Sequence, residues 1–323
     1  MMMIRRFVFS ALLSALMWAP PVLAQEAYPS RPVTFMVGFA AGGGNDVLAR
    51  ILAEHLQQAL GQTFIVENRP GASGMVAISA VRRATPDGYT LLVGSSSAMT
   101  VNPLLLKSAN YNPVEDFVPV AMIGHFPLIV AVNPSVPAKT LQDFIRLAKA
   151  EPGKINYSSA ASSFQIATEM FAQRAGIKLQ NVPYRGSAPA VMAVVANDVS
   201  LTLGDISTVL PQIQGGTLRG LAVTTLQRIP SLPDIPTAGE AGLPGFEVVP
   251  WSALFAPAGT PAAVVGKLER ETARILALPE VQAKVRLLGI EPSTTSAAQV
   301  PERIRTELEL FRKVAETAGI KPE

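Results

Sequence analysis

Short polar loops follow several apolar segments of this chain, and they hold the residue types that bind small anions. They are Gly42-Gly43-Gly44-Asn45-Asp46, Ser95-Ser96-Ser97, Ser158–Ser163, Pro183–Ser187 and Gly204-Asp205. Such loops offer backbone N–H groups, hydroxyls and helix N-termini, which can hold an anion without a charged side chain. Glycine also lets the backbone approach a ligand closely. The chemistry that these residues favour is the binding of a small anionic molecule.

The triple glycine alone is open to other interpretations. It does not start a P-loop, because no Gly-Lys followed by Ser or Thr comes after it. It is a poor dinucleotide fingerprint, because Val47 stands where that motif needs a sixth-position Gly or Ala. It could be only a tight turn between a strand and a helix. The presence of several such loops in two similar units favours a cleft between two lobes.

Four larger side chains lie in or beside these loops, and each has two interpretations. Asp46 either complements the dipole at a helix start, which is worth ~0.3–1 kcal/mol, or accepts a hydrogen bond from a ligand ammonium or hydroxyl group. Asp205 either stabilises a turn or faces the cleft. Arg185 could pair with a distal carboxylate of the ligand or be an ordinary loop arginine. Tyr184 could act as a lid or pack structurally.

The elements that must position these loops alternate between strands and helices. Apolar runs predict strands at 34–39, 63–67, 90–94, 128–132, 155–158, 180–182, 200–203 and 218–224, and residues 251–256 are apolar again. Helical spacing predicts helices over 46–60, 141–150, 261–278 and 300–318, with others ending near 84 and 175 and starting near 188. This order implies an α/β fold with parallel sheets covered by helices. Ligands of such sheets bind at the carboxyl ends of strands, where the polar loops stand.

The composition argues against most catalytic chemistry. The chain has no cysteine, so disulfides, thiol catalysis and zinc–thiolate sites are excluded. Its two histidines are His55, within a helical pattern, and His125, which has no nucleophile motif nearby. Neither has the sequence context of a Ser-His-Asp triad or of a metal site. We therefore expect no enzyme activity, no cofactor and no metal.

The first 24 residues resemble a secretory signal peptide. Two arginines precede an apolar run of about 12 residues, Phe7–Trp18, and Val22-Leu23-Ala24 fits a cleavage site. Removing residues 1–24 lowers the basic count from 27 to 25 against 24 acidic residues, so the net charge falls from +3 to +1. A near-neutral chain argues against nucleic acid as a partner. We expect export to the periplasm, with cleavage after Ala24.

A series of ordered motifs covers essentially the whole chain after the signal segment. The motifs are Tyr28–Pro32, Gly42–Asp46, Glu67–Ala72, Pro86–Tyr89, Val182–Ala190, Asp234–Thr237 and Ala256–Pro261. In this order they resemble the motifs of the tripartite tricarboxylate transporter receptors, the TctC or Bug family.

The resemblance implies a two-lobed fold of the periplasmic-binding-protein type, in which each lobe is a mainly parallel sheet flanked by helices. Residues 25–124 with 250–323 would form lobe 1, and residues 125–249 would form lobe 2. Family members close over organic acids or amino acids, and they hold the ligand carboxylate by backbone amides and bridging waters. The candidate ligand-binding residues are Phe39, Ala40, Gly42, Gly43, Asn45, Asp46, Ser95, Ser96, Ser158, Ala160, Ser162, Ser163, Tyr184, Arg185 and Asp205.

The sequence departs from the family pattern at positions that face the ligand in the family. Asn45 stands where Thr is frequent, and Ser159–Gln165 replaces a stretch that often has glycines and a histidine. The ligand of the family therefore cannot be carried over. We expect a monomeric receptor that delivers a small carboxylate to two membrane transporter subunits. The alternatives are a sensor for a membrane signalling partner or an exported hydrolase.

Overall fold

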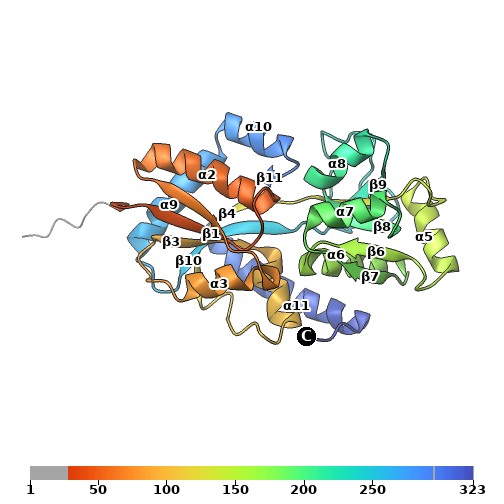
Figure 1. The fold of residues 1–323 in the computed structure, drawn as a ribbon, viewed down its shortest axis with the longest axis horizontal. Coiled ribbons are helices and arrows are strands. Elements are labelled where there is room, and N and C mark those ends of the chain that lie inside the picture. Colours follow the sequence, from red (N-terminus) through yellow and green to blue (C-terminus); the bar gives the residue numbers. More distant parts are fainter. Residues whose placement is uncertain (1–27, 294, 323) are drawn as a thin grey trace, which may run out of the picture. The chain divides into compact units, whose positions relative to one another are not determined.

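Two β-sheets, each covered by helices, form the framework of this protein (Figure 1). The computed structural model describes residues 28–293 and 295–322. The predicted signal peptide, residues 1–24, lies outside the described residues. The chain from Arg31 onwards forms one compact unit.

The first sheet has the strand order β11-β4-β10-β3-β1-β2. Its strands are β1 (Val33–Val37), β2 (Phe64–Asn68), β3 (Thr90–Ser95), β4 (Phe117–His125), β10 (Trp251–Pro257) and β11 (Glu291–Pro292). Strand β1 pairs in parallel with β2 and β3. Strand β10 runs antiparallel to both β3 and β4, and β11 runs antiparallel to β4.

The second sheet has the order β7-β6-β8-β5-β9. Its strands are β5 (Leu128–Val132), β6 (Asn156–Ser159), β7 (Gln180–Pro183), β8 (Leu201–Asp205) and β9 (Arg219–Val223). Strand β6 pairs in parallel with β7 and β8, whereas β5 runs antiparallel to β8 and β9. The chain passes from the first sheet to the second between His125 and Leu128, and it returns between Val223 and Trp251.

Helices lie on both faces of the sheets. In Figure 1, α2 and α10 lie on one side of the first sheet and α3 and α11 lie on the other. The helices are α2 (Gly44–Leu60), α3 (Met75–Arg82), α4 (Asn102–Leu105), α5 (Leu141–Ala150), α6 (Ser162–Ala175), α7 (Ser187–Val195), α8 (Ile206–Gln214), α9 (Ala262–Leu276), α10 (Pro279–Leu287) and α11 (Val300–Ala318), with shorter turns at Ala72–Gly74, Ser97–Val101 and Ala297–Gln299.

The prediction of an α/β fold is confirmed, with one difference in strand direction. The strands β1–β3 and β6–β8 are parallel as expected, but both sheets are mixed. The antiparallel pairs arise where the chain crosses between the sheets. Strand β4 leaves the first sheet at the end where β10 enters it, and β5 enters the second sheet at the end where β9 leaves it. A leaving and an entering strand must run in opposite directions when they are neighbours.

Each sheet has its own aromatic core. On the first sheet, Phe117 and Phe255 meet edge to face at a centroid distance of 6.3 Å, and the buried Trp251 belongs to the same cluster. On the second sheet, Phe144 of α5 stacks on Phe171 of α6 at 6.4 Å. Edge-to-face and offset stacks are the favoured geometries for aromatic rings. These cores fix the strand ends from which the polar loops extend.

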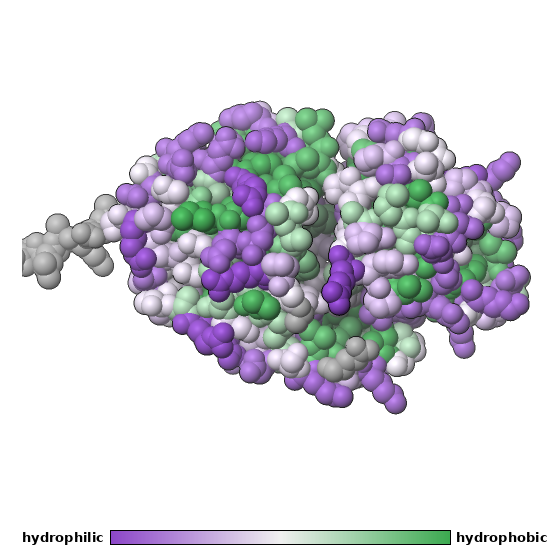
Figure 2. Space-filling view, viewed as in Figure 1, coloured by the Kyte–Doolittle hydropathy of each residue, from purple (hydrophilic) through white to green (hydrophobic). Residues whose placement is uncertain are grey.

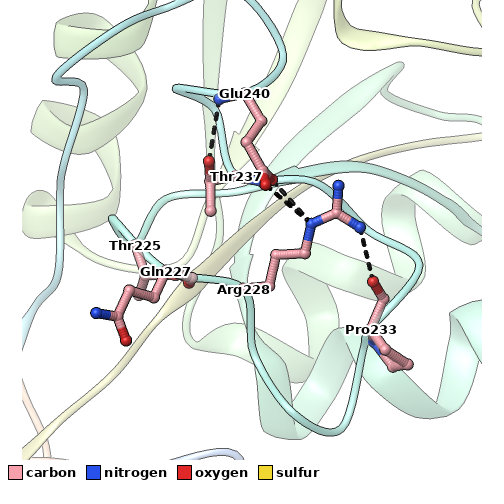
Figure 3. A network of polar contacts seen from close by, with 6 residues as sticks. All are labelled: Thr225, Gln227, Arg228, Pro233, Thr237 and Glu240. Carbon is pink, nitrogen blue, oxygen red and sulfur yellow. Dashed lines mark hydrogen bonds and ion pairs between the residues drawn. The ribbon is translucent and has the colours of Figure 1, made fainter.

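The Pro- and Gly-rich segment between β9 and β10 is held by a polar network (Figure 3). The guanidinium of Arg228 donates from Nε to Glu240 Oε2 at 2.9 Å and from Nη1 to the carbonyl of Pro233 at 2.9 Å. Glu240 in turn accepts from the backbone N–H of Thr237 at 2.8 Å. These bonds hold a segment without regular helices or strands in a defined path back to the first sheet.

Within the described part of the chain, no helix has the length and apolar character needed to cross a membrane.

Candidate functional site

The loop between β1 and α2 is organised by a buried carboxylate. Asp46 is 2% exposed, and its Oδ2 accepts hydrogen bonds from the Gly42 backbone N–H at 2.9 Å and from Arg50 Nε at 3.0 Å. Its Oδ1 accepts from Asn68 Nδ2 at 2.9 Å and pairs with Arg50 Nη2 at 2.9 Å. Burial acts to raise the pKa of Asp46, but the bonds from Arg50, Gly42 and Asn68 outweigh it and hold that pKa below its ordinary value. Both oxygens are therefore engaged inside the protein.

The same network fixes the start of the loop. Asn68 Nδ2 also donates to the carbonyl oxygen of Phe39 at 3.0 Å. Gly42 adopts a φ of +85°, which glycine reaches without strain. Asp46 thus holds both ends of the segment from Phe39 to Gly42: it bonds directly to Gly42, and it bonds to Phe39 through Asn68. The loop residues Ala40 to Gly43 remain exposed.

The N-terminus of α2 packs against Phe126, in the segment where the chain crosses to the second sheet. A Cβ atom on Gly44 would lie 2.6 Å from Cε1 of Phe126, so only glycine fits this contact. Ser252 of β10 donates a hydrogen bond from Oγ to Oδ1 of Asn45. The N-cap residue Gly43 provides no side-chain cap. Within the described residues, no side chain therefore accepts a hydrogen bond from the first N–H groups of α2.

Hydrogen bonds join the strand-end loops of the two sheets. Ser97, after β3, and Ser163, in the first turn of α6, have their Oγ atoms 2.5 Å apart. The backbone N–H of Ser163 also donates to Ser97 Oγ at 3.3 Å. Beside them, Ser162 Oγ donates to Oδ1 of Asn102 at 3.0 Å. The candidate residues Ser162 and Ser163 thus contact the first sheet's loop directly.

The hydroxyl of Ser95 bonds within its own loop, and the hydroxyl of Ser96 bonds to the start of β10. Ser95 Oγ accepts from the backbone N–H of Ala98 at 3.3 Å, and Ser96 Oγ accepts from the backbone N–H of Trp251 at 3.4 Å. Both serines are buried. Their bonds position the residues that follow β3, and the neighbouring Ser97 is the residue that reaches the second sheet.

The turn between β7 and α7 runs beside the loop after β6. The backbone N–H of Tyr184 donates to Ser159 O at 2.8 Å, and that of Gly186 donates to Ala160 O at 3.2 Å. Arg185 between them is exposed, and its guanidinium has no partner among the residues that the structure describes. Helices α6 and α7 start here at Ser162 and Ser187, and their N-cap residues Ala161 and Gly186 again provide no side-chain cap. This corner therefore combines two helix N-termini with a cation that has no partner among the described residues.

Ser158 and Asp205 lie at the ends of neighbouring strands, β6 and β8. The Oγ of Ser158 is buried and has no hydrogen-bond partner within the described residues. Asp205 is 8% exposed and caps α8, since its Oδ1 accepts from the Thr208 backbone N–H at 3.2 Å and from the Ser207 hydroxyl. Its second oxygen, Oδ2, has no partner in the described part of the chain. Asp205 therefore keeps an oxygen available to a ligand, whereas Asp46 does not.

The structure links the candidate residues in three groups. The first is the Phe39–Asp46 loop, the second is the Ser95–Ser97 loop with Ser162 and Ser163, and the third is the Ser158–Ala160 segment with Tyr184 and Arg185. No hydrogen bond among the described residues joins Asp205 or Arg185 to the first group. Between α2 and α3 on one side and α6 and α7 on the other, the surface is hollowed into a groove (Figure 2).

A cavity of about 440 Å³ lies beside the bonded residues Ser97 and Ser163, next to the two segments where the chain crosses between the sheets. The candidate residues Ser96 and Ser163 line it, together with residues that sequence reasoning missed: His125, Trp251, Arg303 and Glu307. Trp251 Nε1 donates to both carboxylate oxygens of Glu307, at 2.9 and 2.8 Å, and Arg303 Nε donates to Glu307 Oε1 at 2.8 Å. The signal for this cluster was the spacing of four between Arg303 and Glu307 on a predicted helix.

Burial sets the charge of the groups around the cavity. It raises the pKa of Glu307, against the opposing influence of Arg303 and the Trp251 hydrogen bond. It lowers the pKa of His125 to about 4, and the nearby positive charge of Arg303 acts in the same direction. His125 is therefore neutral at pH 7. Among the described residues, no group of three or more His, Cys, Asp or Glu side chains could hold a metal ion.

A family model described as "Tripartite tricarboxylate transporter family receptor" matches residues 48–320. The protein BugT of Bordetella pertussis is 36% identical to this chain over 306 residues, which cover 94% of this chain and 94% of BugT.

Two solved structures from Rhodopseudomonas palustris are similar throughout. One, determined with adipate, has a TM-score of 0.85 and 36% identity, and the match covers 92% of this chain and all of the other. The second is MatC with bound malate, with a TM-score of 0.80 and 31% identity over 89% of this chain and 99% of MatC.

Proposed function

Because the chain belongs to the tripartite tricarboxylate transporter receptor family, we propose that it binds a small carboxylate-bearing molecule between its two sheets. In this proposal, residues 25–124 with 250–323 form one lobe, and residues 125–249 form the other. The lobes close over the ligand by bending at the two crossings. The receptor then delivers the ligand to a membrane transporter.

The observation that carries this proposal is the junction between Ser97 and Ser163. Ser97 follows a strand of the first sheet, and Ser163 lies in the first turn of the helix that follows a strand of the second. In open α/β sheets, ligands bind at the carboxyl ends of strands. The junction brings the carboxyl ends of strands from both sheets to one place, as a receptor that encloses its ligand requires.

The helix N-termini at this place favour an anion. Helices α2, α6 and α7 begin without a side-chain cap at the N-cap residue, and the N–H groups at such helix starts are the donors that bind a carboxylate. In α6 one of these groups, the N–H of Ser163, already donates to Ser97 Oγ. The partial positive charge at each N-terminus adds to the attraction. Helix α8 differs, because Asp205 caps it and keeps Oδ2 free. We assign Oδ2 of Asp205 to a hydroxyl or ammonium group of the ligand.

The candidate residues divide into those that contact the ligand and those that hold the loops. We assign contacts to the backbone of Phe39, Ala40, Gly42, Gly43 and Asn45 and to Ser158, Ala160, Ser162, Tyr184, Arg185 and Asp205. We assign Asp46, Ser95 and Ser96 to positioning, because the carboxylate oxygens of Asp46 and the Oγ atoms of both serines already accept hydrogen bonds from the loops or from neighbouring strands. Ser163 has both roles, since it faces the cavity and bonds to Ser97.

Dicarboxylates are the first ligands to test, because similar proteins were solved with adipate and with malate. We propose a binding receptor without catalysis. The signal-like sequence Met1–Ala24 supports export to the periplasm and cleavage after Ala24. We also propose that the protein is a monomer and that it docks to two integral-membrane subunits.

The test is thermal unfolding of residues 25–323, refolded to remove any retained ligand, against mono-, di- and tricarboxylates, aromatic acids and amino acids. A ligand at 100 times its dissociation constant stabilises the folded state by about 2.7 kcal/mol, which raises the melting temperature visibly. We expect the largest rise with a dicarboxylate. A rise confined to neutral or cationic compounds would refute the proposal.

A further inference from the structure

Helix α11 contacts elements of both sheets. Its first half belongs to the core of the first sheet, where Val300 and Ile304 pack with Trp251 and Phe255. Its second half reaches α6, a helix of the second sheet. There Val314 and Ala315 pack in a separate apolar cluster with Ile166 of α6, and also with Val101 and Leu105, which follow β3. The helix therefore spans the two halves of the fold outside the two chain crossings.

Polar bonds fasten the first half of α11 to the returning chain. The indole N–H of Trp251 is shared between the two carboxylate oxygens of Glu307. Arg303 donates to Glu307 and, at 3.4 Å, to the carbonyl of Val249. Trp251 is fully buried, so its N–H needs a partner. This end of the helix is anchored to the first sheet at the point where the chain returns to it.

Among the described residues, fewer side-chain hydrogen bonds hold the second half of α11 than the first. A single side-chain hydrogen bond joins it to α6 among the described residues, from Gln173 Nε2 to the carbonyl of Val314 at 2.9 Å. The cavity of about 440 Å³ adjoins this contact, since Met170 of α6 and Leu310 and Phe311 of α11 line it. Protein interiors are otherwise close-packed. The contact between α11 and α6 is therefore bordered on one side by the cavity, which suits a contact that forms and breaks.

Helix α11 and the Phe39–Asp46 loop lie on opposite faces of the first sheet. Successive side chains of a strand point to opposite faces of its sheet. On β10, Trp251 bonds to Glu307 of α11, whereas its neighbour Ser252 bonds to Asn45 of α2. At the other crossing, Phe126 contacts Gly44 while His125 and Pro127 line the cavity. Helix α11 can thus influence the groove without touching the loop of α2.

We propose that the second half of α11 is a latch, whose docking on α6 holds the strand-end loops of the two sheets together and so sets the affinity for ligand. The inference rests on the proposed function for its effect on ligand binding, because the loops bind one ligand only when they are held together. Its structural part is independent of any ligand. Releasing the latch separates the sheets whether or not a ligand is present.

The test measures the separation of the sheets in ligand-free protein by double electron–electron resonance. The chain has no cysteine, so spin labels attach only where cysteines are introduced. Val76→Cys on α3 and Met192→Cys on α7 place one label beside each sheet, and these side chains are 47% and 51% exposed. The latch variants are Gln173→Ala, which removes the hydrogen bond, and Ala315→Glu, which puts a charge into the apolar contact.

The matched control is Gln142→Ala. Gln142 is an exposed glutamine that donates from Nε2 to the carbonyl of Ala241 at 2.7 Å, a bond of the same kind that lies wholly within the second sheet's part of the chain. We expect longer label distances for both latch variants and the wild-type distance for the control. Circular dichroism confirms that each variant is folded, and Gln173→Ala remains informative if Ala315→Glu is not.

The second part of the test measures ligand binding, with the carboxylate that gives the largest rise in melting temperature. We expect Gln173→Ala to weaken its binding roughly two- to tenfold, as for the loss of one hydrogen bond. Unchanged label distances in folded latch variants overturn the proposal. If no carboxylate binds to any variant, the proposed function fails, and the label distances still decide whether the latch exists.

Discussion

The hydroxyls of Ser97 and Ser163 lie 2.5 Å apart, and this contact joins the end of β3 in the first sheet to the start of α6 in the second. The two residues are 66 positions apart in the sequence. Both are buried. A buried bond between loops of different sheets ties the geometry of the groove to the stability of the fold.

Alanine variants of this pair should show energetic coupling. Ser97→Ala and Ser163→Ala each break the same bond, so the double variant should lose less stability than the sum of the singles. The expected coupling is about 0.5–1.5 kcal/mol, measured by urea unfolding. Ser135→Ala, which removes an exposed hydrogen bond to Asn197, should combine additively with either. Additive losses for Ser97 and Ser163 would mean that the bond does not form in solution.

Asp46→Asn should destabilise the protein as well as weaken binding. The substitution removes the charge that pairs with Arg50 and replaces an acceptor by a donor facing Gly42 N–H or Asn68. We expect a loss of roughly 1–3 kcal/mol in the free energy of unfolding. Glu302→Gln, which breaks an exposed ion pair with Arg305, should cost less than about 1 kcal/mol. Wild-type stability in Asp46→Asn would argue against the loop-holding role.

Asp205→Asn should separate ligand contact from folding. Asparagine caps helices about as well as aspartate, so α8 and the free energy of unfolding should change little. The charge of Oδ2 is lost, and affinity for a ligand with an ammonium group should fall at least tenfold. A ligand that carries only carboxylates should bind the variant as well as or better than the wild type. Equal affinities for both ligand types in both proteins would exclude a contact from Asp205.

Gly44→Ala should force α2 and the crossing segment apart. The new Cβ would meet the ring of Phe126 at 2.6 Å, so we expect a loss of roughly 1–3 kcal/mol in urea unfolding. Gly266→Ala is the control, because Gly266 lies within α9 with no atom closer than 3.4 Å to the added Cβ. It should stabilise the protein by roughly 0.5–1 kcal/mol. Phe126→Leu should recover part of the loss only in the Gly44→Ala background.

His125 should make stability depend on pH. Its pKa is about 4 in the folded protein against an ordinary value of 6.5. Between these pH values the unfolded state binds more protons, so stability falls as the pH falls from 6.5 to 4. The difference amounts to at most roughly 3 kcal/mol. Urea unfolding at pH 7 and pH 4.5 should show a smaller pH dependence for His125→Gln than for the wild type, and an identical dependence would contradict the burial of a neutral imidazole.

Sequence patterns predicted most of the elements that carry the site. The strand at 128–132 and the helices at 141–150 and 300–318 have the predicted bounds, because their apolar spacing is regular. Strand β4 was missed, since Pro119 and Gly124 interrupt its apolar run. Helix α8 was missed because it is short and contains Pro211. The antiparallel strands at the crossings were also missed, because pairing direction depends on where the chain returns.

The candidate site was predictable in its loops but not in its partners. Strand ends with glycine and serine identified the loops from local sequence. The residues that hold those loops, Asn68, Asn102 and Ser252, come from distant segments that only the fold brings near. The two interpretations of Asp46 could not be separated from sequence either. The choice depends on Arg50 and Asn68, whose bonds to the carboxylate are visible only in three dimensions.

The most direct test of the central claim is isothermal titration of refolded protein with adipate, malate and their monoamide analogues. Binding of a carboxylate between strand-end loops predicts one molecule per chain and at least tenfold weaker binding when a carboxylate becomes an amide. Undetectable binding of every carboxylate, or equal affinity for acid and amide, would contradict the claim.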